Sequence, residues 1–384
     1  MTQVAAPFAL YVHVPWCRHV CPYCDFNVYA SSSVPETDDV RAYRGELDAW
    51  TARAEWSGRR PETVYLGGGT PSLLSPSAID AVLDAARRLG LREDAEVTLE
   101  ANPGTLTTER LAGYRAAGVT RLSLGAQSFQ PPLLRTLGRD HTSDQTRAAM
   151  ESARAAGFGN VSLDLIFGVP GQSLAAWEDD LARALALSPE HVSAYALTWE
   201  EGTPFHVWRA RGRLVPVEDD LESAMIDAAA EHLGAAGFRR YEISSWARAG
   251  FESRHNTRYW DGTDYLGIGP GAHSFCATPG PRRWWNLRLP HRWRDAVAAR
   301  GTAVDGEELL SEAEARADFV ITGLRRLAGA DITEFERRFS VAVHAAFPQL
   351  AHLERDGLVE IRATRLRLTP HGLRFADTVG ALLV

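Results

Sequence analysis

The sequence contains no lysine, so all 41 of its basic residues are arginine. This absence excludes Schiff-base chemistry, the attachment of pyridoxal phosphate, and a phosphate-binding loop that depends on lysine. The sequence also lacks an apolar run long enough to span a bilayer, and its N-terminus lacks the basic start and long apolar segment of a secretory signal. We therefore expect a cytoplasmic protein.

Acidic residues slightly outnumber basic ones, which bears on the kind of partner the protein can bind. The formal net charge of the 384 residues is -8, which argues against a protein that holds nucleic acid through phosphate contacts. The hydrophobic fraction of 45% is enough for a large core and, at this length, for two domains. We expect no nucleic-acid partner.

Cysteine is scarce, and its placement is uneven. Only four cysteines occur, and three of them, Cys17, Cys21 and Cys24, lie within eight positions. An odd cluster of this kind does not read as a disulfide framework, and a cytoplasmic setting keeps thiols reduced. Thiolates at short spacing on a loop indicate an iron–sulfur cluster or another soft metal.

Zinc is the main alternative metal, with His13 or His19 as the fourth ligand. Zinc ribbons, however, use two well-separated cysteine pairs, and Cys276 stands alone in this chain. This alternative would make the chain a zinc-stabilised interaction protein. Spacing favours the iron–sulfur cluster.

A short apolar run, a turn and an amphipathic helix recur over the first 200 residues. One helix has Ser75 and a proline at its start and Gly90 at its end, and another extends from Ser143 to Gly157. Such alternation predicts an α/β protein with a parallel sheet, either open and doubly wound or curved into an incomplete barrel. The predicted strands are 8–14, 62–66, 96–101, 121–127, 161–168 and 191–197.

Polar groups decide between the open sheet and the barrel. The cysteine loop, residues 67–70, Glu100, Gln127 and Asp164 all fall at or beyond the carboxyl ends of successive predicted strands. A barrel brings consecutive strand ends around one mouth, whereas an open sheet spreads them along an edge. We therefore predict a partial (β/α)6 barrel.

The strand–helix pattern weakens beyond about residue 215. Residues 1–250 are predicted to form the barrel domain, 251–305 an irregular connection, and 306–384 a winged-helix-like α+β domain. In the barrel domain, a helix at 218–236 and a strand at 239–247 are expected to follow the six units. The C-terminal domain is expected to contain helices at 311–327, 331–339, 341–356 and 370–382 and strands at 358–362 and 365–369.

The C-x3-C-x2-C spacing after the first strand resembles the signature of the radical S-adenosylmethionine (SAM) superfamily, whose architecture is a partial (β/α)6 barrel. The resemblance implies that Cys17, Cys21 and Cys24 hold three irons of a 4Fe–4S cluster. SAM would bind the fourth iron and would accept an electron from the cluster. The resemblance also assigns the methionine end of SAM to a glycine turn, here Gly68, Gly69 and Thr70.

Further polar residues match positions that bind SAM in this superfamily. Singly, each of the acidic, amide or basic side chains is as well explained by a helix cap or a surface ion pair. Together they are implied as cofactor-binding residues. They are Tyr11, Tyr23, Glu100, Gln127, Arg139 and Asp164.

Motifs along nearly the whole chain resemble the HemN/HemW branch of the superfamily. They include YVHVPWC, GGGTPS, LEANP, GAQSF, DLIFGVPGQ and LTPHGLRFAD. Phe26 stands where the HemN oxidases carry another cysteine, and the HNxxYW element at 255–260 is typical of the HemW family of haem chaperones. The resemblance therefore implies haem as a bound group, a haem-acceptor protein, and a reductant such as flavodoxin or ferredoxin.

Several alternatives stay open at this point. An oxygen-independent coproporphyrinogen III oxidase is the alternative function, and no catalytic residue is assigned. Peripheral contact with a membrane-bound acceptor, a homodimer and a second SAM are likewise undecided. His255 is the haem-ligand candidate because a histidine beside aromatic residues can bind iron; alternatively, it braces a loop.

Two more segments attract attention. Trp284 and Trp285 could line a porphyrin site, although paired tryptophans more often pack between domains. The glycine-rich stretch 267–273 is expected to bring main chain near the barrel mouth. No role is assigned to it.

Overall fold

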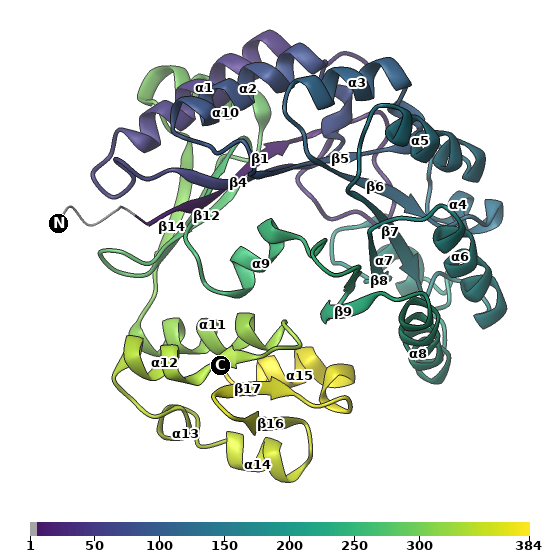
Figure 1. Cartoon of the computed structure of the whole chain (residues 1–384), viewed down its shortest axis with the longest axis vertical. Helices are drawn as coiled ribbons and strands as arrows, with labels where there is room; N and C mark the ends of the chain where they lie inside the picture. Colours follow the sequence, from purple (N-terminus) through teal and green to yellow (C-terminus); the bar gives the residue numbers. More distant parts are fainter. Residues whose placement is uncertain (1–5) are drawn as a thin grey trace.

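The computed structural model describes residues 6–384. Its centre is a curved sheet in which six parallel strands pair in chain order (Figure 1). Their residues are almost continuously buried because helices cover the outer face. The predicted strands are confirmed. They are β1 (Phe8–Val14), β4 (Pro61–Gly68), β5 (Glu96–Ala101), β6 (Arg121–Gln127), β7 (Val161–Phe167) and β8 (His191–Ala196).

The helices between these strands lie outside the curve of the sheet (Figure 1). As predicted, Ser75 caps one helix by accepting a hydrogen bond from the main chain of Ala78 at 3.2 Å. The next predicted helix is capped one residue earlier than expected, by Thr142 in a capping box with Gln145. The helices are α1 (Glu36–Thr51), α2 (Pro76–Arg88), α3 (Thr108–Ala116), α4 (Pro131–Thr136), α5 (Ser143–Ala155), α6 (Leu174–Ala186), α7 (Pro204–Ala210) and α8 (Asp219–Ala235).

The sheet does not close on itself, which confirms the incomplete barrel. Beyond β8 it continues into an antiparallel hairpin of β10 (Ser245–Ala247) and β9 (Arg239–Glu242). At the other end, β1 pairs in parallel with β11 (Tyr265–Ile268). A second, two-stranded sheet of β2 (Trp16–Cys17) and β3 (Tyr29–Ala30) frames the cysteine loop.

The prediction of an irregular connection at 251–305 is wrong. This stretch contains two helices, α9 (Arg254–Trp260) and α10 (Pro290–Arg300). It also adds β11, β12 (His273–Cys276) and β13 (Arg282–Asn286) to the main sheet, which ends at β14 (Val304–Leu309). These strands have only four or five residues each, so their period is hard to recognise. In addition, β11 is fixed by pairing with a strand more than 250 residues away.

The C-terminal domain has its own small core and a three-stranded sheet in the order β15-β17-β16. The long helix expected at 341–356 is interrupted, because Pro348 follows Phe347 and cannot continue the helical hydrogen bonding. The elements are α11 (Glu312–Leu324), β15 (Ala330–Asp331), α12 (Ile332–Phe339), α13 (Val343–Ala346), α14 (Leu350–Arg355), β16 (Val359–Arg362), β17 (Arg365–Leu368) and α15 (Ala376–Ala381).

Main-chain hydrogen bonds join this domain to the end of the barrel sheet. The N–H of Ile243 donates to the carbonyl of Arg325 at 3.0 Å, and the N–H of Leu327 donates to the carbonyl of Tyr241 at 3.0 Å. Figure 1 shows the domain below the open side of the sheet, with α9 between them. The contact therefore places α11 opposite the inner side of the barrel.

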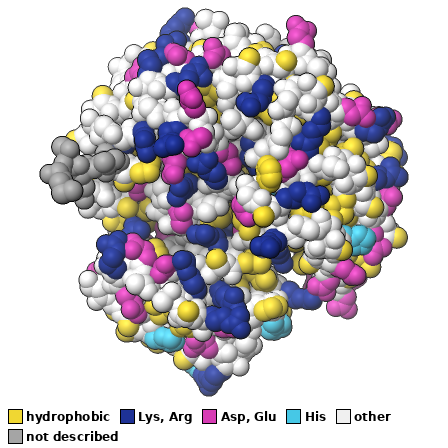
Figure 2. Space-filling model, in the orientation of Figure 1, with side chains coloured by type: hydrophobic (Ala, Val, Ile, Leu, Met, Phe, Trp, Pro, Cys, Tyr) yellow, Lys and Arg dark blue, Asp and Glu magenta, His cyan; other side chains and the backbone are white. Residues whose placement is uncertain are grey.

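The face of the molecule drawn in Figure 2 carries charges of both signs. Arginine and acidic side chains intermingle over the face drawn in Figure 2. Among residues 6–384, no helix combines the length and apolar character needed to cross a bilayer.

Candidate functional site

The three clustered cysteines lie together on one loop. Cys17, Cys21 and Cys24 are free thiols, each half-buried. Thr70 Oγ1 donates to Cys17 Sγ at 3.4 Å, and Arg139 Nη1 donates to Cys21 Sγ at 3.5 Å. Burial raises the pKa of Cys24 to about 11 and shifts the pKa of Cys17 in the same direction. Both thiols therefore keep their protons at neutral pH until a bound metal displaces them.

These thiols line a cavity of about 400 Å³ at the carboxyl ends of the parallel strands. The cavity brings together eight of the nine predicted cofactor-binding residues, from six different segments of the chain: Tyr23, Gly68, Gly69, Thr70, Glu100, Gln127, Arg139 and Asp164. Tyr11 is the exception, because it lines a neighbouring cavity, where its hydroxyl lies 2.9 Å from His13 Nδ1. The convergence expected of a barrel mouth is thus observed for the rest.

The donor arrangement fits a cluster better than a single ion. Within residues 6–384, no three histidine, cysteine, aspartate or glutamate side chains converge closely enough to hold one metal ion. A mononuclear zinc needs its donors at about 2.0–2.3 Å from one centre. In a 4Fe–4S cluster each thiolate binds its own iron, so the three sulfurs need not meet at one point.

The glycine turn is held tightly against the cysteine loop. Gly68 has a φ of 108°, and a Cβ there would lie 2.5 Å from the ring of His13. A Cβ on Gly69 would lie 2.7 Å from the carbonyl oxygen of Trp16. Only glycine permits both the backbone conformation and the close approach.

The N–H groups of the turn are used within the protein. Gly68 donates to Glu100 Oε2 at 3.0 Å, while Gly69 and Thr70 donate to main-chain carbonyls of residues 14 and 16, both at 2.8 Å. These donors are therefore not available to a ligand. The turn contributes a close approach to the cavity and a fixed position for the cysteine loop.

Two carboxyl groups face the cavity from neighbouring parts of the sheet. Glu100 accepts a hydrogen bond from Tyr65 Oη at 2.7 Å, and removal from solvent raises its pKa to about 7, with Asp164 adding to the rise. Asp164 accepts from Ser123 Oγ at 2.8 Å and from Ser162 Oγ at 3.1 Å. Burial also raises the pKa of Asp164, although the serine hydroxyls oppose the shift.

Gln127 has a strained backbone conformation, and Arg139 has an unsatisfied hydrogen-bond donor. Gln127 has a φ of 64° at an irregularity between β6 and β7, a conformation uncommon for a residue other than glycine. Arg139 Nη2 donates to the carbonyl of Gly125 at 3.2 Å. Its Nε is buried and has no partner among the described residues. An orphaned donor on a cavity wall is what a site lacking its ligand would leave.

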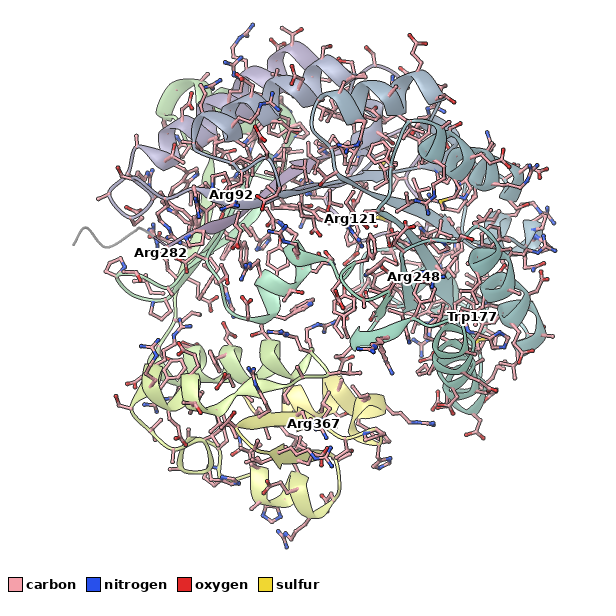
Figure 3. All side chains as sticks on the ribbon, in the orientation of Figure 1. Arg92, Arg121, Trp177, Arg248, Arg282 and Arg367 are labelled. Carbon is pink, nitrogen blue, oxygen red and sulfur yellow. The ribbon has the colours of Figure 1, made fainter. Side chains whose placement is uncertain are left out.

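Sequence reasoning missed five polar residues on the inner face of the barrel. Their signal is a period of two along strands β6 and β8, which turns alternate side chains to the same face. Arg121, labelled in Figure 3, is the first residue of β6, and its Nη1 donates to Asn160 Oδ1 at 2.7 Å. The five are Arg121, Ser123, His191, Ser193 and Tyr195.

A second cavity, of about 880 Å³, lies between the added strands of the sheet and the C-terminal domain. It shares four residues with the cysteine-lined cavity: Asp25, Phe26, Gly68 and Glu100. The two cavities are therefore neighbours separated by a common wall. The glycine-rich stretch 267–273 does run beside this region, as expected, because Asn27 Nδ2 donates to the carbonyl of Pro270 at 2.9 Å.

The HNxxYW element forms helix α9 at the edge of the larger cavity. Tyr259 and Trp260 line the cavity, but His255 does not, and its side chain is fully buried. His255 Nδ1 lies 2.8 Å from Thr63 Oγ1, and Nε2 lies 2.8 Å from Tyr259 Oη. Both ring nitrogens are occupied, which fits the bracing role better than iron ligation.

The tryptophan pair divides between core and cavity. Trp284 is buried and packs on Trp50, with ring centroids 4.9 Å apart. Trp285 lines the larger cavity. Consecutive residues of a strand face opposite sides, so only one member of the pair can line a site.

Family models match most of this architecture. Residues 11–184 match the radical SAM superfamily, and residues 310–375 match the HemN C-terminal domain. Coproporphyrinogen III oxidase (HemN) of Escherichia coli superposes with a TM-score of 0.83 over 98% of this chain and 90% of that one, at 23% sequence identity. That likeness confirms the fold.

Relatives of known name resemble the chain along its length. The heme chaperone HemW of Mycobacterium tuberculosis (strain CDC 1551 / Oshkosh) is 40% identical, covering 97% of this chain and 94% of the relative. The heme chaperone HemW of Escherichia coli (strain K12) is 37% identical, covering 97% of both. A bovine protein, radical S-adenosyl methionine domain-containing protein 1, mitochondrial, is 36% identical over 97% of this chain and 86% of its own. The chain belongs to the HemW family of the radical SAM superfamily.

Proposed function

We propose that this protein is a haem chaperone, which binds haem together with a SAM-ligated 4Fe–4S cluster and passes the haem to an acceptor protein. The full-length similarity to bacterial relatives named heme chaperone HemW supports this function. The observation that carries it is the pair of adjoining cavities, one lined by three thiols and the other by aromatic and arginine side chains.

The cluster would be held by Cys17, Cys21 and Cys24. When bound, such a cluster supplies an electron at low potential. The chain's own contribution is to hold the three sulfurs on one loop, with hydroxyl and guanidinium donors from Thr70 and Arg139 directed at two of them. Hydrogen bonds to the sulfurs are a known means of tuning cluster potential.

SAM would occupy the rest of the smaller cavity. Its amino group would need an acceptor and its carboxylate a cation, and the cavity wall offers Glu100 and Asp164 for the first and Arg139 for the second. The turn at 68–70 would meet the methionine end, and the adenosine end would meet Gln127 and Tyr23. Tyr11 lies beyond Glu100 and would act from the other cavity.

Haem would occupy the larger cavity, whose volume is within the range of cofactor pockets. Phe26 extends between the two cavities and is 61% exposed, so an apolar ligand would bury it. A protein reductant such as flavodoxin or ferredoxin would reduce the cluster, and the acceptor protein would take the haem.

The test uses anaerobically reconstituted protein. We expect stoichiometric uptake of haemin, a change in the cluster's electron paramagnetic resonance signal on adding SAM, and transfer of haem to an apoprotein such as apomyoglobin. Failure to retain haem would overturn the proposal. Formation of protoporphyrinogen IX from coproporphyrinogen III, with SAM and reductant present, would instead favour the oxidase alternative.

A further inference from the structure

The larger cavity contains two histidines, and they differ in whether their ring nitrogens are available. His13 Nδ1 lies 2.9 Å from Tyr11 Oη, and its Nε2 lies 2.9 Å from the carbonyl oxygen of Asn27. His273, on β12, is exposed, and neither of its ring nitrogens has a hydrogen-bond partner among residues 6–384. Only His273 therefore offers a free nitrogen to a ligand in this cavity.

The ring of His273 is held in place without using its nitrogens. It stacks on Trp285, the residue directly across on β13, with ring centroids 5.9 Å apart and planes at 27°. Partial removal of the ring from solvent lowers the pKa of His273, and the guanidinium groups of Arg288 and Arg283 lower it further. The imidazole is therefore neutral at pH 7, the form that binds iron.

Two arginines that line the cavity, one from each domain, have no acidic partner among residues 6–384. Arg288 Nε donates to Asn27 Oδ1 at 3.3 Å, and Arg338 lies over the ring of Phe339, 5.4 Å from its centroid. Within residues 6–384, neither guanidinium forms an ion pair. Arg283 differs, because it is paired with Asp318 and Glu308. The cavity thus holds two free cations for a dianionic ligand.

Aromatic side chains form the remaining apolar surface. Tyr265 and Phe275 come from the added strands, and Phe319 comes from α11 of the C-terminal domain. Flat apolar rings, a free imidazole and two unpaired guanidinium groups together match the chemistry of an iron porphyrin that carries two carboxylates.

We propose that this cavity is the haem site, with His273 as the axial iron ligand and Arg288 and Arg338 binding the two propionates. The inference rests on the proposed function and assigns its cargo to a site away from His255. Binding forms one coordinate bond, in which an imidazole nitrogen donates its lone pair to iron and a water ligand leaves. No electron is transferred in this step.

Haemin titration of the reconstituted protein tests the iron ligand. The change is His273→Ala, with His291→Ala as the matched control, because His291 is exposed on α10 and lines neither cavity. We expect His273→Ala to shift the Soret band and weaken haemin binding by about tenfold or more. The control should behave as wild type, and added imidazole should restore the Soret position in His273→Ala.

Metal-free protoporphyrin IX separates iron ligation from recognition of the macrocycle. His273→Ala should bind it as wild type does, whereas Arg288→Ala and Arg338→Ala should each bind it about tenfold more weakly. Arg292→Ala is the control, since Arg292 is an exposed residue of α10 outside the cavity. The dimethyl ester of the porphyrin should show no dependence on either arginine.

The outcomes distinguish this site from the function it serves. If wild type retains haem and His273→Ala binds it with the same spectrum and affinity, the site assignment is overturned while the haem-chaperone function stands. If wild type binds no haem, the function fails and this site fails with it. A Soret change in His255→Ala, with none in His273→Ala, would identify His255 on helix α9 as the iron ligand instead.

Discussion

The two cavities are built in different ways. The cysteine-lined cavity takes its walls from the carboxyl ends of consecutive strands within one domain, and most of its polar groups hydrogen-bond to one another. The larger cavity is assembled from the added strands β11–β13 and from α11 and α12 of the C-terminal domain. Among residues 6–384, the ring nitrogens of its His273 have no hydrogen-bond partner, and its Arg288 and Arg338 form no ion pair.

The difference indicates a division of labour. A site within one domain keeps its geometry while a resident cofactor stays bound, and a site between domains can open to release its content. A retained cluster with SAM suits the first cavity, and a cargo that must leave suits the second. Changes in either cavity, in the wall they share and in the contact between the domains test this division.

The largest effect is expected from the cysteines. Changing Cys17, Cys21 or Cys24 to Ala should abolish the cluster completely, because each removes one of three iron ligands. Iron and acid-labile sulfide measured after anaerobic reconstitution provide the readout. Haemin should still bind to each variant if the cavities are independent.

Cys276→Ala is the matched control for those variants. Cys276 is a buried free thiol whose Sγ donates to the carbonyl oxygen of Thr278 at 3.1 Å, outside both cavities. Its cluster content should equal that of wild type. Loss of the cluster in this variant, or its survival in all three others, would contradict the ligand assignment.

The next effect concerns the shared wall. Gly68→Ala should lower the free energy of unfolding by about 4 kcal/mol, because a positive φ and a methyl group forced against His13 both cost energy. Urea unfolding measures the loss. Gly157→Ala is the control, since Gly157 has a φ of 84° but no atom within 4 Å of the position that a Cβ would take, and it should cost only about 1 kcal/mol.

The sequence predicted the smaller cavity better than the larger one for a physical reason. Glu100, Gln127 and Asp164 are marked by the apolar strands that precede them, and parallel strands must bring those ends to one edge. His273 faces Trp285 only because β12 and β13 pair as an antiparallel hairpin. Short strands with polar residues give little periodic signal, and the contact with α11 is a matter of domain docking.

The chemistry that a side chain and its sequence neighbours allow was likewise easier to predict than the hydrogen-bond partners of that side chain. The sequence showed His255 beside aromatic residues, which is compatible with iron ligation, but it could not show that Thr63 and Tyr259 occupy both ring nitrogens. Thr63 is 192 residues away in the chain. Hydrogen bonds over such separations depend on tertiary structure.

A pH-dependent effect of moderate size is expected from Glu100. Its pKa rises from 4.5 to about 7 in the folded protein, chiefly by burial. Between these values the unfolded chain has lost the proton that the folded chain keeps, so the free energy of unfolding falls as pH rises. Over this window the loss is on the order of 3 kcal/mol, and Glu100→Gln should remove it.

The matched variant for that measurement is Glu46→Gln. Burial raises the pKa of Glu46 to about 7 as well, but this carboxylate accepts from Trp293 Nε1 at 2.8 Å in the core and does not line the cysteine-lined cavity. Urea unfolding of cluster-free protein at pH 5 and pH 8 should show a reduced pH slope in both variants. SAM binding to reconstituted protein should weaken in Glu100→Gln alone, and equal weakening in both would remove Glu100 from the site.

The smallest effect tests what holds the larger cavity together. Arg374 reaches from the C-terminal domain to Asp227 of α8, with Nη2 2.7 Å from both carboxylate oxygens, but both side chains are largely exposed. An exposed ion pair contributes about 0–1 kcal/mol, so Arg374→Ala should change the unfolding midpoint little. Domain position depends instead on main-chain bonds such as that from Ile243 to Arg325, which the variant leaves intact. Haemin affinity should therefore stay within about twofold of wild type, whereas a large loss would mean that this surface contact, and not the main-chain bonds, keeps the cavity closed.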